Sequence, residues 1–173
     1  MTGTTAPLTA TEVETPVGTL AIVVDDDTVV ASGFTSLADQ LGRLDGELAK
    51  REVVRTDDLG AVTSAVRAYF AGDVDALDSV PVRQPGGAFT QEAWRAMRTI
   101  PAGQTWSYGE LATKAGNPAA VRAAGAACAH NRVAPFVPCH RVVRTGGNLG
   151  GYYYGLPTKR WLLDHESGVT TAF

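Results

Sequence analysis

The residues best suited to chemistry lie in the stretch "VPCHRVV" at 137–143, where His140 directly follows Cys139. A free cysteine thiol titrates at about pH 8.5 and reacts as the thiolate, so it needs a neighbouring base or cation. Histidine is suited to that role because it titrates near neutral pH. The flanking valines predict a buried strand, on which adjacent side chains point to opposite faces. A direct Cys139–His140 contact is therefore not assured, and a bridging water would be needed to connect them.

A third group should orient the imidazole ring of such a pair. Glu166, in "WLLDHES" at 161–167, is the candidate, near the end of a predicted C-terminal helix. The alternative is that Cys139 is a buried structural thiol, because free cysteine often behaves as a small core residue. The chain has two cysteines, too few for a disulfide framework. This number favours free thiols in a reducing cytosol, with a 128–139 disulfide only under oxidising conditions.

A metal site built from Cys128, His130, Cys139 and His140 is the next interpretation to weigh. Residues two apart on a helix lie about 200° apart around its axis, and neighbours on a strand face opposite ways. Structural zinc sites instead favour two-residue gaps within each ligand pair. The spacing argues against zinc, so we expect neither a metal nor another cofactor, and we assign Cys128 to the core.

Two short helices are predicted directly upstream of this stretch. Ser107 and Glu110 form an S-x-x-E capping box, which predicts a helix that starts here and stops at Gly116. Asn117 and then Pro118 predict the start of a second helix. Two short helices joined by a tight turn are typical of a helix-turn-helix, although any packed helix pair has the same pattern.

The second helix is built almost entirely of alanine and glycine between positions 119 and 127, with Arg122 as its single charged side chain. One interpretation is close packing against a neighbouring helix. The other is a helix pressed into a DNA groove, with the arginine inserted into the base stack. The helix lacks the side chains that read base edges, so such binding is expected to depend on phosphates and shape rather than sequence.

Charge and composition divide the chain at "RQPGGAF" (83–89), a linker signal. Residues 1–87 hold 6 Lys and Arg against 14 Asp and Glu, a net charge of −8, whereas residues 88–173 hold 9 against 4, a net charge of +5. The basic half suits a polyanion, although a chance spread of solvated charge gives the same numbers. We expect an N-terminal domain over 1–85 and a C-terminal domain over 86–173.

The N-terminal domain is expected to be an α/β support module, because it shows no cluster of catalytic residue types. The elements predicted from periodicity are strands at 13–34 around turns, one of them at 25–27 where Asp25 to Asp27 suit a turn, a weak helix at 36–50, a helix at 59–72, a strand at 77–83 and a helix at 89–100. The longest apolar runs, such as "LAIVV", are too short to span a membrane, and the N-terminus lacks the features of a secretory signal. We expect no membrane contact and a cytoplasmic location.

Three stretches together resemble the O6-alkylguanine-DNA alkyltransferase family, also called methylated-DNA–protein-cysteine methyltransferases. They are "IPAGQTWSYGELA" (100–112), "VPCHRVV" (137–143) and "GYYYGLPTKRWLLDHES" (151–167); the N-terminal half is similar more loosely, at 14–24 and 65–72. The resemblance implies an RNase H-like N-terminal module, a small sheet plus helix, and a mostly helical, winged-helix-like C-terminal domain. It also implies DNA repair: O6-alkylguanine, chiefly O6-methylguanine, is flipped out of the duplex and its alkyl group is transferred irreversibly to the protein.

The same resemblance implies the residue roles. Cys139 is the acceptor, His140 the base acting through a water, and Glu166 the residue that orients it, while Tyr108 donates a proton to the departing guanine. The residues expected to contact DNA are Tyr108, Arg122, Ala123 and Ala127, with Arg122 filling the gap left by the flipped nucleotide. The residues expected around the substrate pocket are Asn131, Val142, Tyr152, Tyr153, Tyr154 and Lys159; by the same resemblance, Asn131 is also the hinge that ties the second helix to the active-site strand. The expected partner is double-stranded DNA, bound by a monomer through the minor groove without sequence specificity.

Two departures from the family's pattern bear on these expectations. Arg132 stands where the family usually has proline, and Tyr154 stands where members carry glycine or tryptophan. The Tyr154 ring is expected to wall the pocket and to disfavour a bulky benzyl substituent. Two other functions are weighed. Alkyltransferase-like proteins bind the lesion without repairing it but carry tryptophan at the acceptor position, and a cysteine hydrolase would need an oxyanion hole, for which the sequence shows no motif.

Overall fold

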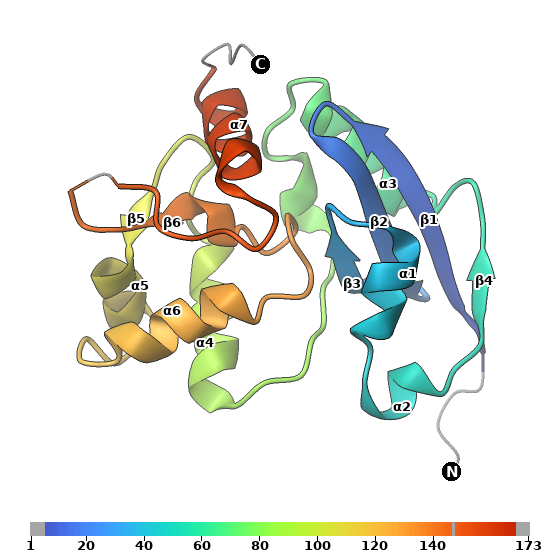
Figure 1. Ribbon diagram of the computed structural model, residues 1–173, viewed down its shortest axis with the longest axis horizontal. Helices are drawn as coiled ribbons and strands as arrows, with labels where there is room; N and C mark the ends of the chain where they lie inside the picture. Colours follow the sequence, from blue (N-terminus) through green and yellow to red (C-terminus); the bar gives the residue numbers. More distant parts are fainter. Residues whose placement is uncertain (1–5, 147, 169–173) are drawn as a thin grey trace.

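The computed structural model describes residues 6–146 and 148–168 and contains two regions side by side (Figure 1). The N-terminal region is a four-stranded sheet with helices on both faces, and the C-terminal region is mostly helical with a two-stranded ribbon. This confirms the expected α/β arrangement followed by a helical one. Within the described ranges, no helix is long and apolar enough to cross a membrane.

The N-terminal sheet has the strand order β3-β2-β1-β4. Its strands are β1 (Leu8–Thr15), β2 (Gly18–Asp25), β3 (Thr28–Gly33) and β4 (Val53–Arg55). The first three form an antiparallel meander, and β4 runs parallel to β1 on the outer edge. Asp26 turns the chain between β2 and β3 with a positive φ of 62°, a conformation that aspartate tolerates better than most residues. The turn predicted at 25–27 is therefore confirmed.

Both faces of this sheet are covered, which explains why β2 is an uninterrupted apolar run. The covering helices are α1 (Leu37–Gly42), α2 (Gly46–Ala49) and α3 (Ala61–Phe70). Leu20, Ile22 and Val24 pack in one cluster with α3, while Ala21 and Val23 pack in a second cluster with α1. Successive strand residues point to opposite faces, so each cluster takes every second residue of β2.

Most of the segment predicted as a strand at 77–83 is not a strand. It begins with the 3₁₀-helix η1 (Ala76–Ser79) and then makes a single parallel bridge between Val82 and Val29. Pro81 has no backbone N–H to donate, so a regular ladder cannot continue through it. The prediction of a strand is wrong for most of this segment.

The C-terminal region carries the predicted helix pair. Its elements are α4 (Ala88–Met97), β5 (Trp106–Ser107), α5 (Tyr108–Lys114), α6 (Val121–Ala129), the 3₁₀-helix η2 (Cys139–Arg141), β6 (Val142–Val143) and α7 (Leu156–Ser167). The capping box is present: Glu110 N–H donates to the Ser107 hydroxyl at 3.0 Å, and Ser107 N–H donates to the Glu110 carboxylate at 2.9 Å.

The second helix of the pair begins later than predicted. The Asn117 side chain accepts from the backbone N–H of Ala119 at 3.2 Å, and its carbonyl accepts from that of Ala120 at 3.0 Å. These bonds close a separate turn, and the helix starts only at Val121. Asn117 therefore caps a turn and does not cap α6, so the two helices are joined by a longer connection than the sequence suggests.

The prediction that Cys139 and His140 lie on a strand is also wrong. They form the 3₁₀-helix η2, after which β6 pairs in parallel with β5. Successive residues of a 3₁₀-helix are about 120° apart around its axis, whereas on a strand they point to opposite faces. In this turn Cys139 and His140 therefore do not have to point in opposite directions, as they would on a strand.

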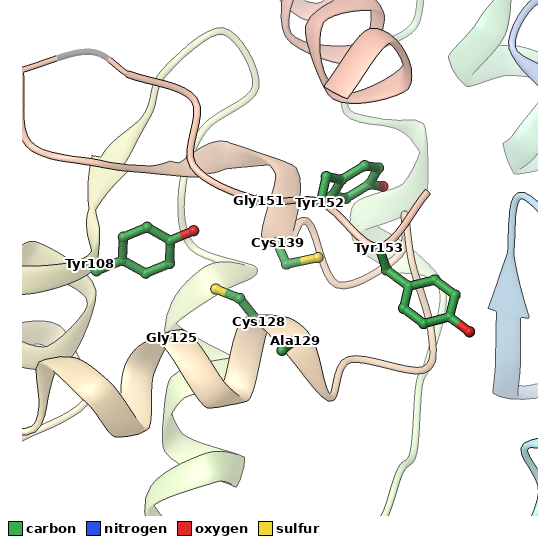
Figure 2. Close-up of a pocket in the computed structure, with 8 residues that line it drawn as sticks. All are labelled: Tyr108, Gly125, Cys128, Ala129, Cys139, Gly151, Tyr152 and Tyr153. Atoms are coloured by element: carbon green, nitrogen blue, oxygen red, sulfur yellow. The ribbon is translucent and has the colours of Figure 1, made fainter. Parts of the chain in front are cut away.

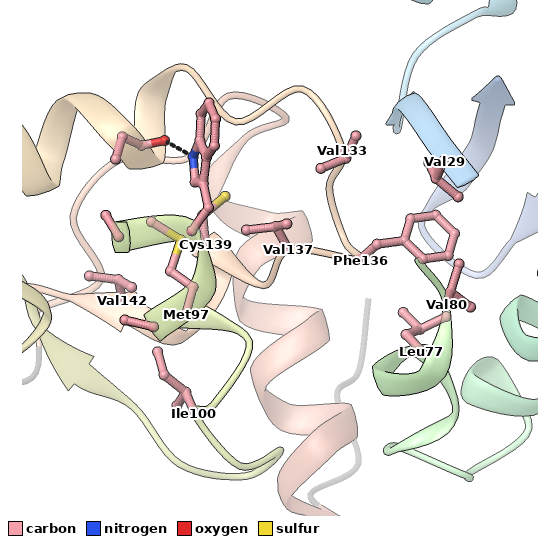
Figure 3. Close-up of a cluster of buried hydrophobic side chains, with 14 of the residues drawn as sticks. Val29, Leu77, Val80, Met97, Ile100, Val133, Phe136, Val137, Cys139 and Val142 are labelled. Carbon is pink, nitrogen blue, oxygen red and sulfur yellow. Dashed lines mark hydrogen bonds between the residues drawn. The ribbon is translucent and has the colours of Figure 1, made fainter. Parts of the chain in front are cut away.

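The larger hydrophobic core is shared by the two regions. Figure 3 shows Phe136 of the C-terminal region beside Val29, Leu77 and Val80 of the N-terminal region. Cys139 belongs to the same cluster and is 8% exposed. The acceptor segment therefore rests on a core to which both regions contribute.

Candidate functional site

A cavity of about 260 Å³ lies between α5, α6, η2 and the loop before α7. It is lined by Tyr108, Gly125, Cys128, Ala129, Cys139, Gly151, Tyr152 and Tyr153. Figure 2 shows the side chains of Cys139 and Cys128 approaching the cavity from opposite walls. Cys128 packs against the core, as predicted, and its thiol also borders the cavity, which the sequence did not indicate.

Helix α6 has two distinct faces. Ala124 and Ala127 are buried, and the Ala127 carbonyl accepts a hydrogen bond of 2.9 Å from the Trp94 indole of α4. The prediction that Ala127 contacts DNA is wrong for this reason. Arg122 and Ala123 are exposed at the start of the helix, so the packing interpretation holds for one face and the other face is free for a partner.

His140 and Glu166 form a buried pair behind the cavity. The His140 Nε2 atom lies 2.7 Å from the Glu166 Oε2 atom, and the two side chains are 1% and 0% exposed. The carboxylate can only accept, so Nε2 carries a hydrogen, and in the neutral form of the ring Nδ1 has a free lone pair. Nδ1 is buried and has no hydrogen-bond partner among the described residues. It is therefore available to accept a proton.

Two further residues hold the Glu166 carboxylate. Arg141 donates from Nε to Oε1 at 2.7 Å and from its NH2 nitrogen to Oε2 at 3.0 Å, and the Tyr69 hydroxyl donates to Oε2 at 2.6 Å. Burial raises the pKa of Glu166, but the charges and hydrogen bonds of His140 and Arg141 outweigh burial and hold this pKa well below its usual range. Glu166 is ionised at neutral pH.

Sequence reasoning missed both of these partners. Arg141 directly follows His140 in "VPCHRVV", and this position is the one feature of the sequence that could have suggested a contact with Glu166. Tyr69 lies on α3 of the N-terminal region, 97 positions before Glu166. No local pattern connects residues so far apart, so only the fold could reveal the contact.

The Cys139 thiol is protonated in this environment. Burial raises its pKa, and a hydrogen bond from Asn131 and the positive charge of Lys159 offset that effect only in part. No hydrogen bond joins Cys139 directly to His140 in the part of the chain that the structure describes. To form a thiolate at neutral pH, Cys139 therefore needs a proton acceptor. His140 could serve only if another group, such as a water molecule, carried the proton between them.

Asn131 connects the end of α6 to the segment before the acceptor. Its side-chain amide donates to the Val137 carbonyl at 2.8 Å, and its oxygen accepts from Val133 N–H at 3.2 Å and from the Gln84 amide at 3.0 Å. Asn131 is buried behind the acceptor and is not among the residues that line the cavity. Its place fits a hinge better than a pocket wall.

The Lys159 ammonium group ties the cavity loop to β6. It is fully buried and donates to the carbonyls of Val142 at 2.8 Å, Gly151 at 3.1 Å and Leu149. Burial lowers the pKa of this lysine. The Val142 carbonyl thus has the Lys159 ammonium group as a side-chain donor. Gly150 on the same loop has a φ of +69°, and a Cβ there would lie 2.9 Å from the Tyr108 hydroxyl. The loop can approach Tyr108 only because position 150 is glycine.

The three consecutive tyrosines point in different directions. Tyr152 and Tyr153 line the cavity, whereas the Tyr154 ring packs edge-on against Phe34 of the N-terminal region with 5.8 Å between centroids. The Tyr154 hydroxyl accepts from Arg43 at 2.9 Å. The expectation that Tyr154 walls the pocket is therefore wrong; the ring exposed at the cavity is that of Tyr153, with the Arg43 guanidinium 4.5 Å above it.

The described residues contain no group of three or more His, Cys, Asp or Glu side chains that could hold a metal ion. Of the four residues weighed for zinc, His130 is exposed at the end of α6, while Cys139 and His140 are buried. The arrangement is instead that of a thiol beside a base and its carboxylate partner.

A buried thiol backed by a His–Glu pair, beside two short helices with an exposed arginine, defines a protein with a nucleophilic cysteine and a helix-turn-helix surface. Residues 88–168 match the family model described as 6-O-methylguanine DNA methyltransferase, DNA binding domain. Methylated-DNA–protein-cysteine methyltransferases of Shigella flexneri and Mycobacterium tuberculosis are 35% and 39% identical, over 90% and 92% of this chain and 93% of each relative.

Solved structures agree with the sequence comparisons. The crystal structure of Mycobacterium tuberculosis OGT in complex with DNA has a TM-score of 0.76 and 31% identity, covering 92% of this chain and 93% of that chain. The chain belongs to the methylated-DNA–protein-cysteine methyltransferase family, which confirms the resemblance in its motifs.

Proposed function

We propose that the protein repairs O6-alkylguanine in double-stranded DNA, chiefly O6-methylguanine, by transferring the alkyl group to Cys139. The observation that carries this proposal is the Cys139 thiol at the wall of a cavity, with the buried His140–Glu166 pair behind it. The family membership of the chain supports the same reaction.

The geometry supports a balanced transfer step. A water between the Cys139 thiol and the free Nδ1 of His140 relays the thiol proton to the imidazole, and ionised Glu166 stabilises the imidazolium that results. The sulfur then attacks the methyl carbon, a C–S bond forms, and the bond from that carbon to guanine O6 breaks. The Tyr108 hydroxyl, which borders the cavity, supplies a proton to the departing guanine. The thioether is stable, so each molecule acts once.

The target base must leave the duplex to reach this cavity, because its O6 atom is inaccessible inside the base stack. We assign the insertion role to Arg122, which is exposed on the first turn of α6 beside Ala123. Small exposed residues allow close approach to the minor groove, and contacts to phosphates carry no sequence information. Binding is therefore proposed to be independent of sequence.

Finer features of the fold belong to the same proposal. The order β3-β2-β1-β4, with β4 parallel to β1, supports an RNase H-like N-terminal module, and the β5–β6 ribbon beside α5 and α6 supports a winged-helix-like second domain. We place the boundary between residues 85 and 86. The monomeric state and the cytoplasmic location stay predictions.

The alternative function, lesion binding without repair, is disfavoured by the cysteine at position 139. The test is the intact mass of the protein after mixing with a duplex that contains one O6-methylguanine. We expect a gain of one methyl group per chain that does not increase with excess DNA, and no gain for Cys139→Ser, which should still bind DNA. No gain by the parent protein would support the binding function, and uptake by the variant would refute the assigned acceptor.

A further inference from the structure

Tyr69 contacts the proposed catalytic machinery from the N-terminal region. It is fully buried on α3, and its hydroxyl donates to Glu166 Oε2 at 2.6 Å. The same oxygen lies 2.7 Å from the His140 ring nitrogen. Arg141 also donates to this oxygen, at 3.0 Å, so three donors from the two regions of the chain share one carboxylate oxygen.

We propose that Tyr69 is a positioning residue for alkyl transfer, which fixes the Glu166 carboxylate and limits its attraction for the proton of His140. The proposal rests on the proposed function, because it concerns the same site. It gives the N-terminal region a role in the reaction beyond support, through one hydroxyl group delivered across the interface between α3 and α7.

The physical reason lies in the sharing of Oε2. A hydrogen bond to a carboxylate stabilises its negative charge and so reduces the energy gained when a neighbouring imidazole becomes positively charged. His140 must be neutral before it can accept the thiol proton at Nδ1. A carboxylate without the Tyr69 hydroxyl would hold more of the imidazole in its charged form at moderately acidic pH, where that form cannot act as the base.

The Tyr69 hydroxyl is a dependable donor. Burial, followed by the negative charge of Glu166, raises its pKa well above the ordinary value, so the hydroxyl remains protonated at neutral and acidic pH. The ring is held in place on α3 by edge contacts with Phe70, at 4.9 Å, and with His165, at 5.1 Å between centroids. His165 Nε2 also lies 2.7 Å from the Tyr69 carbonyl, which anchors the backbone of α3 to α7.

Titratable and charged groups from several elements surround the Glu166 carboxylate. The titratable and charged groups that face Glu166 are His140 and Arg141 on η2, Tyr69 on α3, Asp78 on η1 and Tyr152 on the cavity loop. Phenylalanine preserves the ring and its contacts at position 69 and removes the hydroxyl alone. A shift in pH dependence on this substitution therefore reports on the hydroxyl.

The test is the single-turnover rate constant for methyl transfer as a function of pH, for the parent and for Tyr69→Phe. We expect the acidic limb of the profile to move to higher pH by about half a unit, and the plateau rate to fall roughly fivefold because the carboxylate is less well oriented. A thermal melt confirms that the variant is folded at each pH.

Two further variants separate positioning from general destabilisation. Thr63→Val removes another buried hydroxyl of α3, which donates to the Asp58 carboxylate away from the site, and it should lower stability without moving the pH profile. In a Glu166→Gln background, Tyr69→Phe should cause no further shift, because the charge that it modulates is gone.

The inference is overturned if the parent and Tyr69→Phe have superimposable profiles. It is also overturned if Thr63→Val gives the same shift, or if the shift persists in the Glu166→Gln background. A parent protein that takes up no methyl group at any pH would instead refute the proposed function, so the two failures are distinguishable.

Discussion

Replacing Glu166 by glutamine tests whether the buried carboxylate stabilises the folded protein through the residues of the site that it binds. Glu166 is 7% exposed and accepts four hydrogen bonds, two from Arg141, one from His140 and one from Tyr69. A glutamine oxygen in the Oε2 position would keep three of these donors. Its NH₂ group would then stand where Oε1 accepted from Arg141, so that two donors face each other and the arginine charge loses its partner.

The expected cost follows from this loss. Removing one partner of a buried ion pair destabilises a protein by about 3–5 kcal/mol, because an uncompensated charge stays buried. A domain of ordinary stability, about 5–15 kcal/mol, should survive this change, although with a reduced margin. We therefore expect Glu166→Gln to fold and to unfold at a much lower urea concentration than the parent.

The assay is urea unfolding of parent and variant at a series of pH values, followed by circular dichroism. His140 and Arg141 outweigh burial and hold the pKa of Glu166 below its value in an unfolded chain, about 4.3. The stability that the carboxylate contributes is thus fully present above that pH and is lost as the pH falls through the folded-state pKa. The part of the difference that comes from the ionised carboxylate should therefore narrow below about pH 4.

Two results would refute this reasoning. One is a difference at pH 7 of less than about 1 kcal/mol, the range of an exposed ion pair. The other is a full-sized difference that does not change down to the lowest pH at which both proteins remain folded, because the effect would then be steric and not electrostatic.

Other expected outcomes concern the cavity and DNA. Tyr153→Gly should increase the second-order rate with free O6-benzylguanine, because Tyr153 lines the cavity, whereas Tyr154→Gly should not, because that ring packs on the N-terminal region; equal gains would contradict this placement. Arg122→Ala should slow repair of duplex DNA far more than reaction with the free base, since only the duplex requires flipping; equal losses would indicate a structural arginine. DNA affinity should fall steeply with salt concentration as phosphate counterions are released, and a flat salt titration would exclude the electrostatic argument.

Features decided by neighbouring residues were predictable from the sequence. The capping box of Ser107 and Glu110 and the turn at 25–27 depend on backbone groups within a few positions, and both are present in the structure. The motif around Cys139 also pointed correctly to the family, and it placed Glu166 on a C-terminal helix.

Features that depend on distant parts of the chain were not predictable. Valines on both sides of Cys139 suggested a strand, but the residues between them form a 3₁₀-turn. The direction of Tyr154 is decided by Gly33, where a Cβ would lie 1.8 Å from the tyrosine hydroxyl. The contact of Tyr69 with Glu166 needs two helices from different regions to pack together, which no local pattern records.

The central claim is that Cys139, and not the second thiol at the same cavity, accepts the alkyl group. The most direct measurement is peptide mapping by mass spectrometry after the protein has reacted with a duplex carrying isotopically labelled O6-methylguanine. Burial raises the pKa of the Cys128 thiol far above its ordinary value. The described residues hold no second His–Glu pair that could serve Cys128 as His140 and Glu166 serve Cys139, so all of the label should be on the peptide that contains Cys139. Label on the Cys128 peptide, or label shared between the two, would contradict the account.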